Sequence, residues 1–172
     1  GADAVAIGVG AGKNYQGNYA VAIGERAGYG NDGIQGNYAI AIGARAGYNN
    51  QQGNAIAIGR QAGNNSQGAY SVAMGWYAGN QSQNSAAVAI GEEAGRYNQN
   101  SETVAIGSWS GHEYQGWKAV AIGSSAGNYY QGDWSVAVGL NAGRTSQGHS
   151  SVAMGHVAGY TNQGADSVAI GV

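Results

Sequence analysis

Apolar and polar residues alternate in a short segment that recurs along the whole chain. The tetrad Val-Ala-Ile-Gly, or a close variant, begins at residues 5, 21, 40, 56, 72, 88, 104, 120, 136, 152 and 168. The starts lie 16 residues apart, except for one interval of 19 that places a three-residue insertion between Gly30 and Ile34. Counted from the tetrad as positions 1 to 16, each repeat, or rung, reads V-A-I-G-x-x-A-G-x-x-x-Q-G-x-x-(A/S). Self-similarity at such a period is typical of solenoid proteins.

The repeats occupy nearly the entire sequence. Ten complete copies fill residues 5–167, Gly1–Ala4 match the tail of an earlier copy, and Val168–Val172 open an eleventh. We therefore interpret residues 1–172 as a single repeat domain. It is expected to be a segment of a longer array, or a chain that a neighbour continues.

The local pattern favours strands over helices. Glycines at positions 4 and 8 of every rung would each cost ~1 kcal/mol inside a helix. The five residues from position 16 to position 4 alternate with the period of a strand, and Gly and Asn after them favour turns. We expect one short strand, a turn, a second short strand around the alanine at position 7, and a return loop. Stacked coils of this kind form an all-β, parallel β-solenoid.

The first strand has two different faces. Valine or isoleucine at position 1 and isoleucine, valine or methionine at position 3 share one face, which we expect to be the core. The other face carries only small residues, whereas a face exposed to solvent would be expected to carry larger polar side chains in some of the rungs. We therefore expect it to pack against other subunits, most simply in a homotrimer; the alternative is that it lines a very flat coil. The predicted subunit interface is Ala6, Ala22, Ala41, Ala57, Ala73, Ala89, Ala105, Ala121, Ala137, Ala153 and Ala169.

Glutamine recurs once per rung at position 12. Stacked amides can bond to one another along the rod, or to backbone that the turns leave unpaired. Either role is structural. This predicted structural column is Gln16, Gln35, Gln51, Gln67, Gln83, Gln99, Gln115, Gln131, Gln147 and Gln163.

The variable positions hold all 12 Tyr and all 4 Trp. Such aromatic residues give a large contact area at low entropic cost, and they stack on sugar rings or pack at interfaces. The densest group is a candidate ligand-binding site, although packing between subunits would also explain it. Its members are Trp109, Tyr114, Trp117, Tyr129, Tyr130 and Trp134.

Composition narrows the function classes. Seven basic and nine acidic residues give a net charge of −2, so electrostatics provides no reason to expect a nucleic-acid partner. The apolar runs are far shorter than the ~20 residues of a transmembrane helix, so this segment is not expected to insert into a membrane. No metal site or cofactor is expected, because there is no Cys and because His112, His149 and His156 fall in different columns as solvated loop residues. The segment Ile-Gly-x-x-Ala resembles an acyltransferase repeat, but it recurs only once per 16 residues, which is too seldom for that fold. We therefore expect that the chain is not an enzyme.

Asp166-Ser167-Val168-Ala169-Ile170-Gly171, and each copy of it, resembles the head repeats of trimeric autotransporter adhesins, the YadA-like heads. Similar repeats occur in phage and viral tail fibres. The resemblance implies a left-handed parallel β-roll, a homotrimer, and a role in attachment outside the cell, on a cell surface or a virion fibre. The adhesin period is usually ~14, shorter than this one, so the outer loops should differ.

The leading hypothesis is a non-enzymatic adhesin or fibre segment. Its rigid oligomeric β-roll would present variable aromatic residues to a host glycan or cell-surface protein. The alternative is a purely structural filament or spacer that assembles end to end, because exposed rung ends are unpaired sheet edges.

Overall fold

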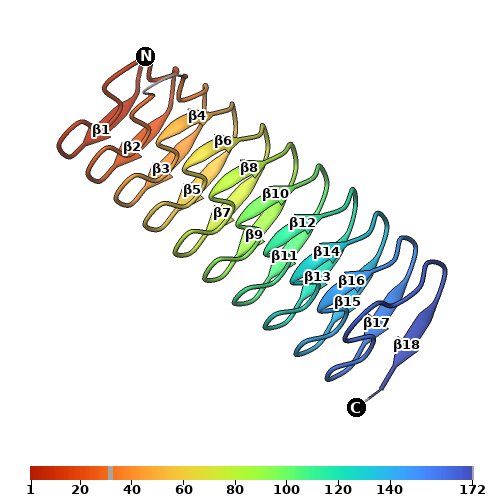
Figure 1. The fold of residues 1–172 in the computed structure, drawn as a ribbon. Coiled ribbons are helices and arrows are strands. Elements are labelled where there is room, and N and C mark those ends of the chain that lie inside the picture. The colour runs from red at the N-terminus through yellow and green to blue at the C-terminus, as the bar shows by residue number, and fades with distance from the viewer. Residues whose placement is uncertain (31–32, 172) are drawn as a thin grey trace.

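The computed structural model describes residues 1–30 and 33–171. They form a rod of stacked coils in which each repeat makes one turn of a parallel β-solenoid (Figure 1). The predicted fold class is therefore confirmed. No α-helix occurs among these residues, and hence none that could cross a bilayer.

The first strands of all rungs build one sheet, and equivalent positions of the repeat face each other across neighbouring strands, as in Val104↔Val120. Each strand covers positions 1 to 3, where alternating β-branched residues favour extended backbone. The strands of this first sheet are, in order, β1 (Val5–Ile7), β2 (Val21–Ile23), β3 (Ile40–Ile42), β5 (Ile56–Ile58), β7 (Val72–Met74), β9 (Val88–Ile90), β11 (Val104–Ile106), β13 (Val120–Ile122), β15 (Val136–Val138), β17 (Val152–Met154) and β18 (Val168–Ile170).

A second sheet runs along the other side of the coil and holds positions 10 to 12. The expectation of a strand around position 7 was wrong, because that alanine lies in the turn between the two strands. Residues 31–32 of the insertion lie outside the described residues. Directly after it, Gln35 forms β-bridges to Gln16 and Gln51, so the glutamines of successive rungs are in register again. The strands are β4 (Asn49–Gln51), β6 (Asn65–Gln67), β8 (Gln81–Gln83), β10 (Tyr97–Gln99), β12 (Glu113–Gln115), β14 (Tyr129–Gln131) and β16 (Thr145–Gln147).

The interior of the coil is lined by alanine and glutamine, with some serine and threonine, which reverses the two predicted faces of the first strand. From Ala22 to Ala153, every alanine of the predicted subunit interface is completely buried within the single chain. Only the end members, Ala6 and Ala169, retain exposed surface, because no full rung covers them. Buried alanines cannot contact another subunit, so the predicted interface is wrong, and the alternative of a very flat coil is the one observed.

The reason for this reversal is the thickness of the coil. A Cβ atom added at Gly111 would lie 3.2 Å from the Cβ of Ala105, so the two sides of the coil are already in contact. Such a space admits methyl groups but no valine or isoleucine side chain. The residues at positions 1 and 3 therefore point outward, and the prediction that they form the core was wrong as well.

The glutamine column spans this thin interior. The Gln115 Nε2 atom donates to the carbonyl oxygens of Val104, at 2.8 Å, and Ala119, at 3.1 Å. The Gln115 Oε1 atom accepts a hydrogen bond from the Gln99 amide of the preceding rung, also at 3.1 Å. Each amide thus joins the two sides of its own coil, and some also join successive coils, which pairs the buried side-chain amide with backbone carbonyl groups of the interior.

The glycine at position 4 is required by the backbone. Gly123 has φ of +122°, a conformation that residues with a side chain rarely adopt, and a Cβ atom there would lie 2.6 Å from the Gly139 carbonyl oxygen of the next rung. This column therefore reflects a tight turn and close stacking of the rungs, and not a smooth docking surface.

Candidate functional site

The turns of each coil carry the variable side chains outward. In the rung that starts at Val104, the Ser110 amide donates to the Gly107 carbonyl oxygen at 3.3 Å, and Trp109, third in this turn, has φ of 61°. The turn at the other side of the same rung places Lys118 at φ of 55°. A positive φ at the third residue is typical of a type II turn, where glycine is usual. Residues at positions 6 and 15 have a positive φ along the rod, and many of them are bulky. This backbone strain is therefore a property of the repeat and not of one site.

The six aromatic residues of the predicted ligand-binding site do not form one cluster. At one edge of the coil, Trp109 stacks on the His112 ring and Tyr129 meets the same ring edge to face. Tyr114 and Tyr130 stack on the outer face of the second sheet, with ring centroids 5.0 Å apart and planes 4° apart. The structure therefore divides these residues into three pairs by location: the first two residues each contact His112, the second two stack on each other, and the third pair lies at the opposite turn.

That third pair is Trp117 and Trp134, whose rings meet edge to face at 5.4 Å. The backbone between them is tied by the Asp133 carboxylate, which accepts a hydrogen bond from the Trp117 amide at 2.7 Å. The Lys118 ammonium group lies 4.2 Å from the Trp117 ring centroid, an arrangement that favours a cation–π contact, and 3.5 Å from Glu102. Both indole rings are partly exposed, so this pair presents an aromatic surface at the tip of the turn.

A buried polar corner surrounds His112, which the sequence analysis expected to be solvated. Its side chain is only 5% exposed, and Nε2 lies 3.1 Å from Glu93 Oε2, which also accepts a hydrogen bond from Arg96. Trp109 stacks on the imidazole at 4.6 Å between centroids. The expectation was wrong for His112 because its ring is enclosed by the turn of the preceding rung, whereas His149 and His156 are exposed as expected.

The residues at position 9, which His112 occupies, could have indicated from the sequence that this side chain is buried. Asparagine occupies the same position at Asn64, Asn80 and Asn128, and each side-chain amide donates to a carbonyl oxygen of the preceding rung. A polar side chain at this position is therefore directed inward. The histidine instead meets the side chain of Glu93 in the preceding rung, where each of these three asparagines bonds to a backbone carbonyl.

Burial lowers the pKa of His112 below its ordinary value of 6.5, and Arg96 lowers it further. The hydrogen bond and negative charge of Glu93, together with the charge of Glu113, oppose the shift without cancelling it. The folded chain therefore takes up this proton less readily than the unfolded chain. The contribution of His112 to the free energy of unfolding is fully present above pH 6.5, and it is lost as the pH falls toward the pKa of His112 in the folded chain.

We expect His112→Asn to remove this part of the pH dependence. The asparagine would adopt the hydrogen bond that Asn128 makes and would carry no titrating group. Urea unfolding above and below pH 6.5 measures the effect, and the difference between the two conditions should shrink in the variant. His149→Asn, at an exposed histidine, is the control and should retain the full difference. An equal difference in both variants would contradict the assignment.

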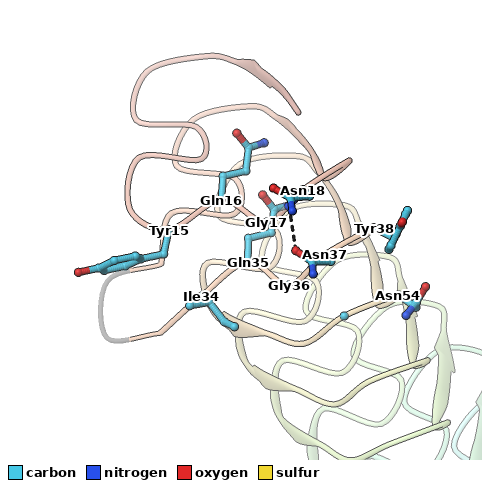
Figure 2. Close-up of a pocket in the computed structure, with 11 residues that line it drawn as sticks. Tyr15, Gln16, Gly17, Asn18, Ile34, Gln35, Gly36, Asn37, Tyr38 and Asn54 are labelled. Atoms are coloured by element: carbon cyan, nitrogen blue, oxygen red, sulfur yellow. Dashed lines mark hydrogen bonds between the residues drawn. The ribbon is translucent and has the colours of Figure 1, made fainter. Parts of the chain in front are cut away.

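A hollow of about 630 Å³ lies near the N-terminal end of the rod, and apart from Gln16 and Gln35 of the glutamine column its lining residues were not predicted as site residues. Figure 2 shows Asn18 and Asn37 at its centre, joined by a hydrogen bond from the Asn18 backbone amide to Asn37 Oδ1 at 2.9 Å. Tyr15 and Tyr38 extend outward on opposite sides of the hollow. The hollow combines amide groups with aromatic rings, as does a smaller one farther along the rod.

The outer face of the first sheet is apolar. Position 3 places Ile90, Ile106 and Ile122 in one column, each between 36% and 38% exposed, and position 1 places a half-buried column of valines and isoleucines beside it. Monomeric soluble proteins rarely expose continuous apolar patches of more than a few hundred Å². This sheet face therefore has the character of a contact surface that a single chain leaves uncovered.

The part of the chain that the structure describes contains no group of three His, Asp or Glu side chains that could hold a metal ion. The family model of the YadA head domain repeat matches residues 53–78 in two copies, which include β5, β6 and β7. The resemblance to YadA-like head repeats is confirmed for these residues, and the same pattern recurs in the other rungs. No curated protein and no solved structure matches the chain significantly.

Proposed function

We propose that this chain, in which residues 53–78 carry two YadA head domain repeats, is a non-enzymatic segment of a surface adhesin or fibre. It acts outside the cell, on a cell surface or a virion, as a rigid rod that carries attachment surfaces. The observation that carries the proposal is the family match, set in an uninterrupted rod whose rungs all follow the matched pattern.

The rod assembles as a homotrimer through the apolar outer face of the first sheet. The valine and isoleucine columns run from β1 to β18 without a polar interruption, over about 48 Å at ~4.8 Å per strand. Three such faces can enclose a common apolar axis. This arrangement replaces the alanine interface expected from the sequence, and it leaves the second sheet and both sets of turns exposed.

The exposed surfaces of the trimer carry the attachment residues. Trp117 and Trp134 form a pair of partly exposed indole rings at one turn, and Tyr114 stacks on Tyr130 on the second sheet. Paired rings are restrained by each other, so little conformational entropy is lost when a glycan or a cell-surface protein binds. The frame of the rod repeats, whereas these side chains differ from rung to rung.

Attachment can be tested with beads coated with the chain and mixed with host cells. We expect the native chain to attach, and Trp117→Ala combined with Trp134→Ala to weaken attachment by about tenfold, because buried aromatic anchors dominate interfaces. The matched control is Trp76→Ala, at an exposed tryptophan on a different turn, which should attach as the native chain does.

Two measurements separate attachment from a purely structural role. Light scattering on each variant checks that the assembly is unchanged, so that a loss of attachment is not a loss of fold. If the native chain attaches to no cell type and instead grows end to end into filaments, the adhesin function is contradicted and the spacer alternative is supported.

A further inference from the structure

A shallow trough follows the outer face of the second sheet through its middle rungs. Position 11 points outward, and it holds Asn50, Ser66, Ser82 and Asn98 in successive rungs. The bulky Tyr114 follows in the next rung and closes one end. Two adjoining hollows, of about 320 and 190 Å³, lie along this stretch and share Asn84.

The trough is lined by neutral hydrogen-bonding groups. The larger hollow is bordered by the amides of Asn84, Asn98 and Asn100 and the hydroxyl of Ser82, and neither hollow has a charged residue in its lining. In the described part of the chain, no hydrogen bond joins these four exposed side chains to another protein group. Each amide therefore offers both a donor and an acceptor to a ligand.

An aromatic platform closes the trough. One face of the Tyr114 ring stacks on Tyr130, and the side chain, which is 49% exposed, also borders the larger hollow. The stacking restrains the ring before any ligand arrives. An aromatic face beside amides that can pair with hydroxyl groups matches the two surfaces of a sugar ring, which has an apolar C–H face and a polar rim.

The backbone of the trough is not free to bind an extended peptide. The Asn100 amide donates to the Gln115 carbonyl oxygen at 3.1 Å, and the Asn84 amide donates to the Gln99 carbonyl oxygen at 3.0 Å. These bonds run from rung to rung, so the trough lies on the face of a sheet and not at an edge. A peptide could therefore not add as a strand, which is the usual way for an extended peptide to gain affinity and register.

We propose that this trough binds a linear, uncharged oligosaccharide that lies along the rod, with one sugar ring stacked on Tyr114 and the following rings over Asn98 and Ser82. Equivalent side chains recur at the strand spacing of ~4.8 Å, so similar hydrogen-bonding groups meet successive units of a repeating polymer. This inference rests on the proposed attachment function, for which it names the ligand class.

The test uses the full chain and a printed panel of neutral oligosaccharides, with sialylated and sulfated counterparts on the same surface. We expect binding to neutral members only. Tyr114→Ala should weaken it about tenfold, because aromatic stacking contributes about 1 kcal/mol or more beside the buried area. Tyr70→Ala is the matched control, since Tyr70 is an exposed tyrosine at positive φ that borders neither hollow.

A second variant fills the trough and leaves the fold intact. Ser82→Tyr places in the middle rung a residue that the same column already holds at Tyr114 and Tyr130, at a similar positive φ. We expect it to abolish binding while thermal unfolding stays unchanged. Retained binding in this variant, or equal binding of charged and neutral sugars, would overturn the proposal.

The outcomes also separate this inference from the proposed function. Binding to the neutral oligosaccharides that persists in both Tyr114→Ala and Ser82→Tyr would overturn the sugar site, and attachment of the native chain to cells would then leave the adhesin function standing. Attachment that is lost when the cells are treated with protease, but not when their glycans are removed, would point to a protein ligand and overturn it too. A native chain that attaches to no cell would contradict both.

Discussion

Leucine in place of Ala105 is expected to unfold the rungs around β11. The methyl group of Ala105 is completely buried, and the opposite side of the coil at Gly111 leaves no room for three further carbon atoms. Overpacking usually costs about 1–3 kcal/mol. We expect at least the upper end of this range, because the neighbouring interior side chains are alanines and hydrogen-bonded glutamines, which cannot move aside.

Thermal unfolding followed by circular dichroism measures this effect. Ile106→Leu is the matched control, because it changes the neighbouring, outward-pointing residue and should cost less than about 1.5 kcal/mol. Comparing these two variants also tests which face of the strand is buried inside the coil. If Ala105→Leu dissociated subunits while the coil kept its unfolding temperature, the alanine column would be an interface after all.

Lysine at both Ile106 and Ile122 is expected to separate the proposed trimer into single chains. The two isoleucines are neighbours in the same outward column of the first sheet, each about two-thirds buried in the single chain. In a trimer around a common axis the two substitutions would place six ammonium groups close together in an apolar contact. Leaving a buried charge without a partner costs about 3–5 kcal/mol, so the assembly should be lost while each coil still folds.

Light scattering measures the molecular mass and so distinguishes the trimer from the single chain. The native mass should be about 52 kDa, three times the chain mass of 17.3 kDa, and the variant should fall to 17.3 kDa. Ser146→Lys with Asn162→Lys adds the same charge at position 11 of two successive rungs, at and just beyond the end of the second sheet, and this control should remain trimeric. A native chain of 17.3 kDa, or a variant that stays at the native mass, would rule out this contact surface.

The candidate sites could be predicted from the sequence only in part. Counting positions along the repeat correctly assigned the aromatic residues to variable places, but it could not pair them. Tyr114 meets Tyr130 because both occupy position 11 of successive rungs, whereas Trp109 lies at a different turn from Trp117. The amides of the trough were overlooked because asparagine and serine between glycines are typical of ordinary loops, and only the second sheet aligns them along one surface.

The sequence by itself determined the repeat, its length, and the stacking of identical residues in parallel sheets. A period of 16 residues that returns the same tetrad each time is compatible with few other folds. The same period also identified the glutamine column, whose amides hydrogen-bond within and between the coils.

Only the tertiary structure decided which face of the first strand lies inside. Alternation with a period of two distinguishes two faces, but it is the same whichever of them is buried. Tight turns on both sides bring the two sheets so close that only small side chains and the extended glutamine side chains fit between them. The larger apolar residues are therefore forced outward, onto the surface where another molecule can cover them.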